Sequence, residues 1–213
     1  MLIDLQKIVP VYFEQGKMNG SEVWNKPLSF NSGEHVHIVA PSGSGKTSLI
    51  HFLYGLRNDY IGTVNYDGKD IKEFSAEKFA SFRQKNISVV FQDLRLFIDQ
   101  TVLENLELKR QLQPFHPESK MAEMADRLGI SSKLHKTIRT CSYGEQQRVA
   151  IIRSLMQPFD FLLLDEPFSN LDENNRQKAL DLIDEECKAR NASMIFADLK
   201  MNPFFEGHKI LHL

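Results

Sequence analysis

Residues 40–48 read Ala-Pro-Ser-Gly-Ser-Gly-Lys-Thr-Ser, and they follow an apolar run at 36–40 that is typical of a buried strand. Residues 48–54 predict a helix that ends near Gly55. A glycine-rich turn between a strand and a helix directs several backbone N–H groups at one point, where the helix N-terminus adds partial positive charge. The stretch therefore predicts a phosphate-binding loop.

Within this loop we expect Lys46 to reach the outer phosphates of a nucleotide and Thr47 to bind magnesium. The usual pattern G-x-x-x-x-G-K-[ST] begins with glycine, which Ala40 replaces; alanine is acceptable there if its φ is negative. The alternative is an accidental Gly/Ser loop, but Gly-Lys-Thr stands where the strand–loop–helix context requires it. The loop residues expected to bind the nucleotide are Ser42, Gly43, Ser44, Gly45, Lys46, Thr47 and Ser48.

The composition describes an ordinary globular chain. Its 213 residues suit one large domain or a domain with an insertion. The 26 basic and 28 acidic residues give a net charge of −2, so electrostatics do not favour nucleic acid or an anionic membrane as the main partner. We expect neither a signal peptide nor a membrane span, because no apolar run approaches about 20 residues. Cys141 and Cys187 form neither a metal spacing nor a disulfide framework, which favours the cytosol.

Alternating apolar and turn-forming segments predict an α/β fold. Residues 1–35 predict short, antiparallel strands, and further strands are expected at 63–66, 87–91, 161–164 and 194–197. Helical patterns separate the later strands, so the core sheet should be mainly parallel with helices on both faces. Residues 93–139 lack a convincing strand and instead show helical spacing at 102–108 and 121–128.

We therefore expect a single domain over residues 1–213. Its α/β core would comprise residues 1–92 and 154–213, with an N-terminal antiparallel β subdomain. A helical subdomain would be inserted at about 93–153.

A second candidate site element is the apolar strand at 161–164, which ends in Asp165 and Glu166. Ligands in open parallel sheets bind beyond the carboxyl ends of the strands. Asp165 would then lie beside the phosphate loop and coordinate magnesium, and Glu166 would act as general base toward the attacking water. The alternative is a strand capped by two solvated acids, and the phosphate loop upstream makes the catalytic interpretation the stronger one.

Residues 141–150 read Cys-Ser-Tyr-Gly-Glu-Gln-Gln-Arg-Val-Ala. Ser142 and Glu145 form the capping-box pattern S-x-x-E, which predicts a helix from here to about Met156. A capping box alone is a structural feature. The same helix N-terminus is also a potential anion site, to which Ser142 offers a hydroxyl and Gly144 a backbone N–H.

Together these segments resemble the nucleotide-binding subunits of ATP-binding cassette (ABC) ATPases. Residues 141–153 resemble the family's signature, with Cys141 in place of its leucine and Tyr143 in place of its first glycine. Residues 165–172 resemble the Walker B motif and D-loop, and residues 90–93 resemble the Q-loop, with Gln92 as its glutamine. The resemblance covers essentially the whole chain. Within the family, the chain looks most like the lipoprotein-release, macrolide-export and cell-division ATPases.

The resemblance implies a P-loop NTPase that binds ATP with Mg²⁺, in which Lys46, Gln92 and Glu166 serve hydrolysis and Gln92 also contacts the metal. It implies a head-to-tail dimer, either homodimer or heterodimer. Each ATP would lie between one phosphate loop and the partner's signature helix, so that Ser142 and Gly144 act in trans. Asp172 would lie at the interface.

An aromatic residue near the N-terminus stacks on adenine in this family. Tyr12 or Phe13 is suitably placed for this contact, and Trp24 less so. Each of these residues would equally suit a half-buried strand.

Two departures from the family pattern stand out. The family's histidine after the strand at 193–197 falls on Leu199 or Asp198, neither of which is histidine. Since one phosphate donor contributes several kcal/mol in the transition state, we expect slow hydrolysis with nucleotide binding retained. The ring of Tyr143 would line the cleft that the partner's ATP enters, where it either packs harmlessly or obstructs closure.

The resemblance implies the motor subunit of a transporter, peripheral to the inner face of the cell membrane, with a permease on a separate polypeptide. The expected docking surface is a groove at residues 92–100, where Leu94, Leu96, Phe97 and Ile98 would be partly exposed unless they pack against the helical insertion. The alternative function is a regulatory cassette that binds ATP, hydrolyses it slowly or not at all, and signals to a membrane or cell-envelope partner. A phosphate-loop kinase is disfavoured by residues 142–172.

Overall fold

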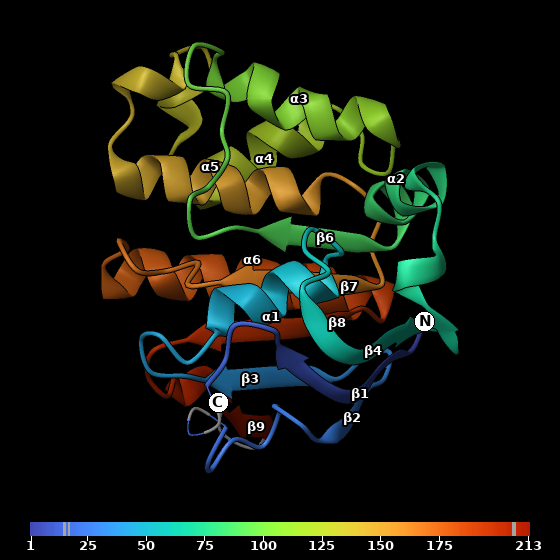
Figure 1. The fold of residues 1–213 in the computed structure, drawn as a ribbon. Helices are drawn as coiled ribbons and strands as arrows, with labels where there is room; N and C mark the ends of the chain where they lie inside the picture. The colour runs from blue at the N-terminus through green and yellow to red at the C-terminus, as the bar shows by residue number, and fades with distance from the viewer. Residues whose placement is uncertain (15, 17, 206–207) are drawn as a thin grey trace.

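The computed structural model describes all residues except 15, 17, 206 and 207, and it contains two sheets that share one apolar cluster with α1 (Figure 1). The parallel sheet has the order β6-β7-β8-β3-β9, with bounds Ile87–Val90, Phe161–Asp165, Ser193–Asp198, His35–Val39 and Lys209–His212. The antiparallel sheet has the order β2-β1-β4-β5, with bounds Pro27–Phe30, Ile3–Pro10, Tyr60–Tyr66 and Lys69–Asp70.

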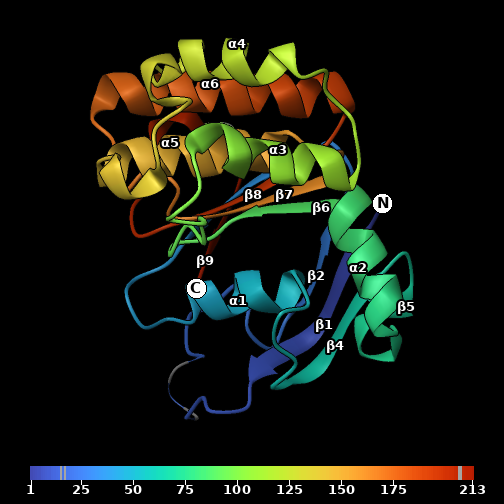
Figure 2. The same ribbon diagram turned by 90° about the horizontal axis from the view of Figure 1, so that it is seen from above.

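Helices cover both faces of the parallel sheet (Figure 2). The helix α1 lies between the two sheets, and α3, α4, α5 and α6 cover the opposite face. The helices α1 to α6 span Lys46–Leu53, Ala76–Lys85, Val102–Leu112, Ser119–Arg127, Tyr143–Leu155 and Glu173–Arg190. Short 3-10 helices span Ile71–Glu73, Ser131–Lys133, Ile138–Thr140 and Pro203–Phe205.

The strand β7 shows why the parallel sheet is buried on both faces. Phe161 and Leu163 pack into the apolar cluster under α1 and the antiparallel sheet, whereas Leu162 and Leu164 pack into the cluster under the outer helices. Successive side chains of a strand point to opposite faces, so a continuously apolar strand requires cover on both sides.

The predicted fold class is confirmed: an α/β fold with a parallel core sheet, an antiparallel β subdomain and an additional helical part. One difference concerns the antiparallel sheet, in which β1 pairs with both β2 and β4. The subdomain thus draws on residues 60–70 as well as on the first 35. The exact division into a core at 1–92 and 154–213 and a helical insertion at 93–153 stays a prediction.

The strand directions assemble the candidate site. Because β3, β6, β7 and β8 run parallel, their carboxyl ends meet at one edge of the sheet, on the left in Figure 1. The segments that leave this edge are the phosphate loop after β3, Gln92 after β6, Glu166 after β7 and Leu199 after β8. Four segments far apart in sequence therefore meet at one place.

Candidate nucleotide-binding site

The phosphate loop takes the conformation that its glycines allow. Gly43 and Gly45 have φ of 80° and 94°, and Gly45 precedes the first residue of α1. A Cβ atom on Gly45 would lie 2.7 Å from the ring of Phe13. Glycine is therefore required at this position both by φ and by space. Ala40 is buried and does not have a positive φ, so the methyl group that departs from the usual pattern is tolerated.

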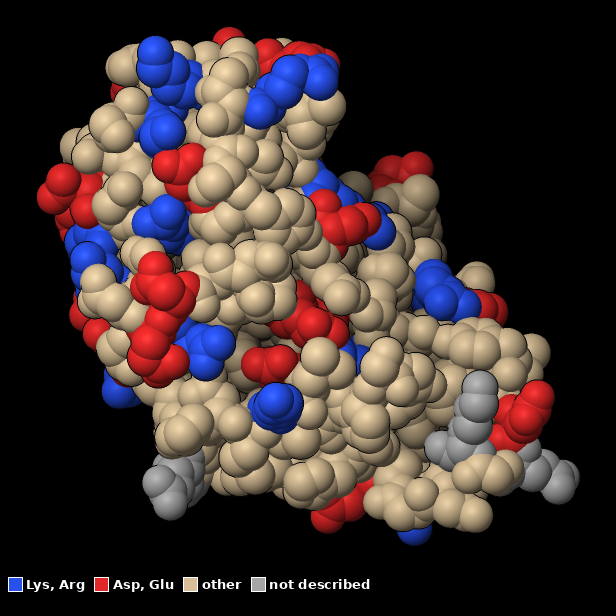
Figure 3. Space-filling model, turned by 90° about the vertical axis from the view of Figure 1, so that its left-hand side faces the viewer, with Lys and Arg blue, Asp and Glu red and all other residues tan. Residues whose placement is uncertain are grey.

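A cavity of about 290 Å³ lies in front of this loop and brings most of the predicted nucleotide-binding residues together. It is lined by Tyr12, Phe13, Pro41, Ser42, Gly43, Gly45, Lys46, Thr47, Ser48, Gln92 and Glu166. Ser44 does not line the cavity; its hydroxyl donates to the carbonyl oxygen of Pro41 at 2.8 Å. Figure 3 faces this edge of the molecule, on which acidic and basic side chains are interspersed.

Lys46 and Glu166 form a nearly buried ion pair inside the cavity. The Lys46 ammonium nitrogen lies 2.6 Å from Oε1 of Glu166, and the two side chains are only 6% and 11% exposed. The Coulomb attraction between two charges is larger where water is largely excluded than at an exposed surface. Lys46, which is expected to bind phosphate, is thus paired with Glu166, which is expected to act as base.

The Asp165 carboxylate is fully buried at the end of β7, and neither of its oxygens makes a hydrogen bond with a described residue. Burial raises the pKa of Asp165 to about 6, against the opposing effects of the Thr47 hydroxyl and the Lys46 ammonium group. Nearby, Thr47 donates a hydrogen bond to Oε1 of Gln92 at 3.4 Å. An unsatisfied carboxylate beside hydroxyl and amide oxygens fits a hard cation such as Mg²⁺.

The backbone of Glu166 is strained. Its φ is 47°, which is uncommon for a residue with a side chain. The backbone N–H donates to the carbonyl oxygen of Ala197 at 2.9 Å, and the backbone oxygen accepts from Nε2 of Gln147 at 3.3 Å. These contacts hold the strained turn that directs the Glu166 side chain toward Lys46.

Aromatic residues flank the mouth of the cavity. Tyr12 is 49% exposed, its hydroxyl contacts the hydroxyl of Ser48, and the Arg57 guanidinium lies 5.2 Å from its ring centre. Phe13 lines the cavity beside it. Trp24, in contrast, is buried and donates its indole N–H to the carbonyl oxygen of Ser44 at 2.9 Å. Trp24 therefore supports the loop from beneath rather than presenting a free ring face.

The predicted signature helix begins as expected, because Ser142 caps α5 and forms a capping box with Glu145. Ser142, Gly144 and Asp172 do not line the cavity of their own chain. Asp172 caps α6, with one oxygen accepting from the backbone N–H of Asn175 at 2.8 Å.

Two residues of α5 make contacts that the sequence did not predict. A Cβ atom on Gly144 would lie 2.8 Å from the backbone oxygen of Asn170. The buried Gln147 side chain donates to Ser169 at 3.1 Å and accepts from the backbone N–H of Asn170 at 3.1 Å. The match of residues 146–150 to the family signature was the only signal that singled out this glutamine.

Leu199 and Asp198, on which we expect the family's histidine position to fall, lie at the end of β8. Leu199 is 43% exposed, and its backbone N–H donates to a carboxylate oxygen of Asp198 at 2.6 Å. Burial raises the pKa of Asp198. The Glu166 carboxylate raises this pKa further, and the Lys46 ammonium group lowers it. Neither side chain supplies an imidazole donor at this edge.

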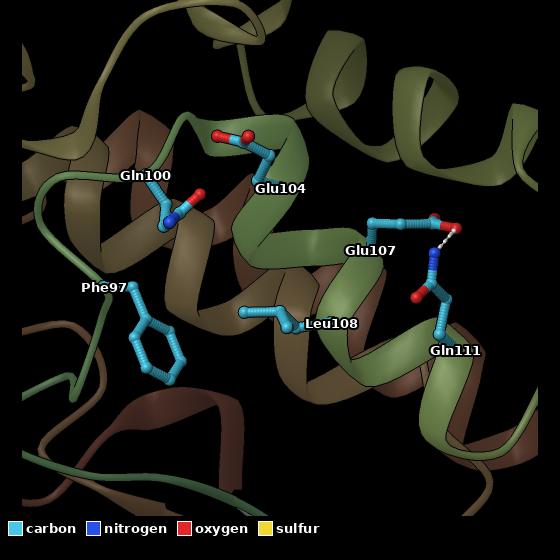
Figure 4. A pocket seen from close by; sticks show the side chains of 6 residues that line it. All are labelled: Phe97, Gln100, Glu104, Glu107, Leu108 and Gln111. Carbon is cyan, nitrogen blue, oxygen red and sulfur yellow. Dashed lines mark hydrogen bonds between the residues drawn. The ribbon is translucent and has the colours of Figure 1, made fainter.

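At residues 92–100, the predicted partial exposure is confirmed for three of the four apolar side chains and wrong for one, whereas the docking role of this segment stays a prediction. Phe97 and Ile98 are 57% and 48% exposed, and Leu96 is partly buried, whereas Leu94 is only 3% exposed. Leu94 is buried because it packs into the apolar cluster beneath the outer helices. Beside Phe97, a cavity of about 350 Å³ follows α3 (Figure 4).

A sequence profile described as "ABC transporter" matches residues 25–169, more than half of the chain. The chain belongs to the ABC transporter family. The cassette is 38% identical over 160 residues to the molybdate/tungstate import ATP-binding protein WtpC of Pyrococcus horikoshii. The aligned region covers 73% of this chain but only 45% of WtpC. It is 33% identical over 173 residues to the lipoprotein-releasing system ATP-binding protein LolD of Buchnera aphidicola, covering 79% of the chain and 75% of LolD.

The structure of the cassette resembles the dimeric structure of MJ0796, described as a bacterial ABC transporter cassette. The TM-score is 0.84 at 25% identity, over 99% of this chain and 94% of MJ0796. The predicted family, an ABC ATPase, is therefore confirmed, and LolD lies in the predicted lipoprotein-release group. Among the described helices, none combines the length and the apolar character required to cross a bilayer.

Proposed function

We propose that this ABC cassette is the ATP-hydrolysing subunit of a transporter, placed at the cytoplasmic face of a membrane by a separate integral membrane permease. The observation that carries the proposal is the cavity in which the phosphate loop, Gln92 and Glu166 meet, with the unsatisfied Asp165 carboxylate nearby. The names of the relatives, an import ATP-binding protein and a lipoprotein-releasing ATP-binding protein, support transport as the process.

In this proposal the nucleotide phosphates lie against the backbone N–H groups of residues 42–48, and Lys46 binds the outer phosphates. Tyr12 stacks on the adenine, because its ring is half exposed at the mouth of the cavity and its hydroxyl is tied to Ser48. Phe13 is the alternative stacking residue on the same wall.

Magnesium would be held by the Thr47 hydroxyl, the Gln92 amide oxygen and, directly or through water, the Asp165 carboxylate. The metal would neutralise charge on the phosphate oxygens as the phosphoryl group is transferred. Its presence would also supply the cation that the buried Asp165 lacks.

Glu166 changes partner during the reaction. In the structure its carboxylate is paired with Lys46. When the phosphates of ATP take Lys46, the Glu166 carboxylate is released and turns to the attacking water as general base. The strained backbone at Glu166 fixes where this carboxylate emerges.

Two copies of the cassette, or a cassette and a related chain, would close head to tail on ATP. Ser142 and Gly144 would then contact the partner's nucleotide, and Asp172 would lie at the interface. In support, these residues do not line the cavity of their own chain, and the similar cassette MJ0796 is described as dimeric.

The permease would dock in the cavity beside α3, where Phe97 and Leu108 form an apolar surface surrounded by polar side chains (Figure 4). Of the two acids at this surface, Glu107 is paired with Arg110, whereas Glu104 makes no ion pair with a described residue. A loop with an apolar side chain and a neighbouring lysine or arginine would match this surface.

The proposal is tested by isolating the native complex from membranes and identifying the integral membrane protein that copurifies. Magnesium-dependent ATP hydrolysis that this protein stimulates would support a transport motor. Tight nucleotide binding with negligible turnover, even in the complex, would contradict it in favour of a regulatory cassette.

A further inference from the structure

Tyr143, the first residue of α5, contacts a residue of the proposed magnesium site in the same chain. Its hydroxyl donates a hydrogen bond to the backbone oxygen of Gln92 at 3.1 Å, across 51 residues of sequence. The Tyr143 side chain is 48% exposed, so burial of its ring does not account for the position it holds. The hydroxyl is the group that ties Tyr143 to Gln92.

The same helix also holds the backbone that follows Gln92. Arg153, about three turns further along α5, donates to the backbone oxygens of Leu94 and Arg95 at 2.7 and 2.8 Å. Leu94 and Arg95 have φ of 56° and 47°, a conformation that costs free energy for residues with a side chain. The helix α5 therefore fixes this turn at two points, one on each side of Asp93.

At the first of these points, the Gln92 side chain faces the phosphate loop. Its Oε1 lies 3.4 Å from the Thr47 hydroxyl oxygen. Neighbouring oxygen ligands around octahedral Mg²⁺ are about 2.9 Å apart, so a small movement of the two side chains would bring these atoms to the separation that the metal requires. Because Mg²⁺ demands near-ideal geometry, a small displacement of the Gln92 backbone would cost metal affinity.

We infer that Tyr143 is a positioning residue for the magnesium site of its own subunit: its hydroxyl fixes the backbone of Gln92 so that the amide oxygen faces Thr47. The inference rests on the proposed function, which places magnesium between Thr47, Gln92 and Asp165. It gives the signature helix a role within its own chain, in addition to the role proposed for Ser142 and Gly144 across the dimer.

The test is the substitution Tyr143→Phe, which removes only the hydroxyl. The affinity of a fluorescent ATP analogue is titrated against Mg²⁺ and also measured in EDTA. The magnesium concentration for half-maximal enhancement should rise about two- to tenfold, the value of one hydrogen bond, while the affinity in EDTA stays unchanged. Ser32→Ala is the matched control, because it removes a hydroxyl that donates to the distant backbone oxygen of Asn191 at 3.0 Å.

The inference is overturned if wild type and Tyr143→Phe require the same magnesium concentration. It is also overturned if the variant requires less, since the ring would then hinder the site rather than order it. A wild-type cassette whose nucleotide affinity does not respond to Mg²⁺ would instead contradict the proposed magnesium site itself. Thermal unfolding of each variant establishes that a change in affinity does not arise from a change in folding.

Discussion

The ammonium group of Lys46 and the carboxylate of Glu166 are paired at 2.6 Å within the cavity that faces the phosphate loop. Each group compensates the charge of the other. In the proposed function, a phosphate of ATP would replace this carboxylate as the partner of Lys46 and release the Glu166 side chain to act as base. Binding and activation of the base would then be coupled through one lysine.

This coupling predicts separate effects on binding and hydrolysis for Glu166→Gln. The variant keeps a side chain that accepts a hydrogen bond from Lys46 but cannot take a proton from water. ATP affinity should be retained or increased, because Lys46 no longer has to leave a carboxylate. Hydrolysis should fall about 10²- to 10⁴-fold, the usual contribution of a general base. Calorimetry and single-turnover kinetics measure the two effects, and an unchanged rate of hydrolysis would exclude Glu166 as the base.

The residue at the family's histidine position should limit the rate. Leu199 cannot donate a side-chain hydrogen bond, so we expect slow hydrolysis in the wild type. Leu199→His should raise the rate by about 10²- to 10³-fold, because one donor to the transition-state charge contributes on that order. Met201→His is the control, since Met201 is similarly exposed two residues further along. Equal rates for wild type and Leu199→His would show that this donor is not what limits hydrolysis.

The buried Asp165 carboxylate should make the free protein less stable as the pH rises. Burial raises the pKa of Asp165 from 3.8 to about 6, so between these values the folded chain holds a proton that the unfolded chain has lost. Folding stability therefore falls as pH rises through this interval. Above about pH 6, Asp165→Asn should raise the free energy of unfolding of the free protein by up to about 3 kcal/mol. Below about pH 4 this gain in stability should vanish.

Thermal unfolding of Asp165→Asn and wild type from pH 4 to 8 measures this difference. Saturating magnesium and ATP should cancel the gain, because the metal pairs with the wild-type carboxylate. Asp181→Asn, at an exposed position of α6, is the control. A gain in stability that is the same at every pH would contradict the account of Asp165.

Gly144 should be required for packing within one chain as well as for the proposed contact across the dimer. Alanine would gain up to about 1 kcal/mol of helix propensity at this position. Its Cβ atom, however, would lie 2.8 Å from the backbone oxygen of Asn170, and overpacking of this kind costs about 1–3 kcal/mol. Gly144→Ala should therefore lower the denaturation midpoint of the monomer, whereas Gly16→Ala, where the methyl group meets open space, should not. If the Gly144→Ala monomer is as stable as the wild-type monomer, Gly144 is needed only for the proposed contact across the dimer.

Local sequence patterns predicted those parts of the site that follow directly from one strand and one turn. Lys46 and Thr47 follow a glycine-rich turn, and Asp165 and Glu166 follow an apolar strand, so the parallel sheet rule alone placed them at a common edge. The capping box at Ser142 was equally visible, because both of its partners lie within four residues.

The contacts between these elements were not predictable from local patterns. The bond from Tyr143 to Gln92 joins residues 51 positions apart, and neither residue type indicates the other. The burial of Leu94 was also missed, because an apolar residue in a loop suits exposed and buried positions equally well. Only the packing of the outer helices decides which position it takes.

The most direct test of this account is a calorimetric titration of the purified cassette with ATP and Mg²⁺, compared with Lys46→Gln, whose amide can still donate a hydrogen bond to Glu166. The account predicts saturable binding of one nucleotide per chain, and its loss or severe weakening in the variant while thermal unfolding shows that the variant is folded. No uptake by the wild type, or equal uptake by both proteins, would contradict the convergence of the phosphate loop and the β7 carboxylates on one nucleotide site.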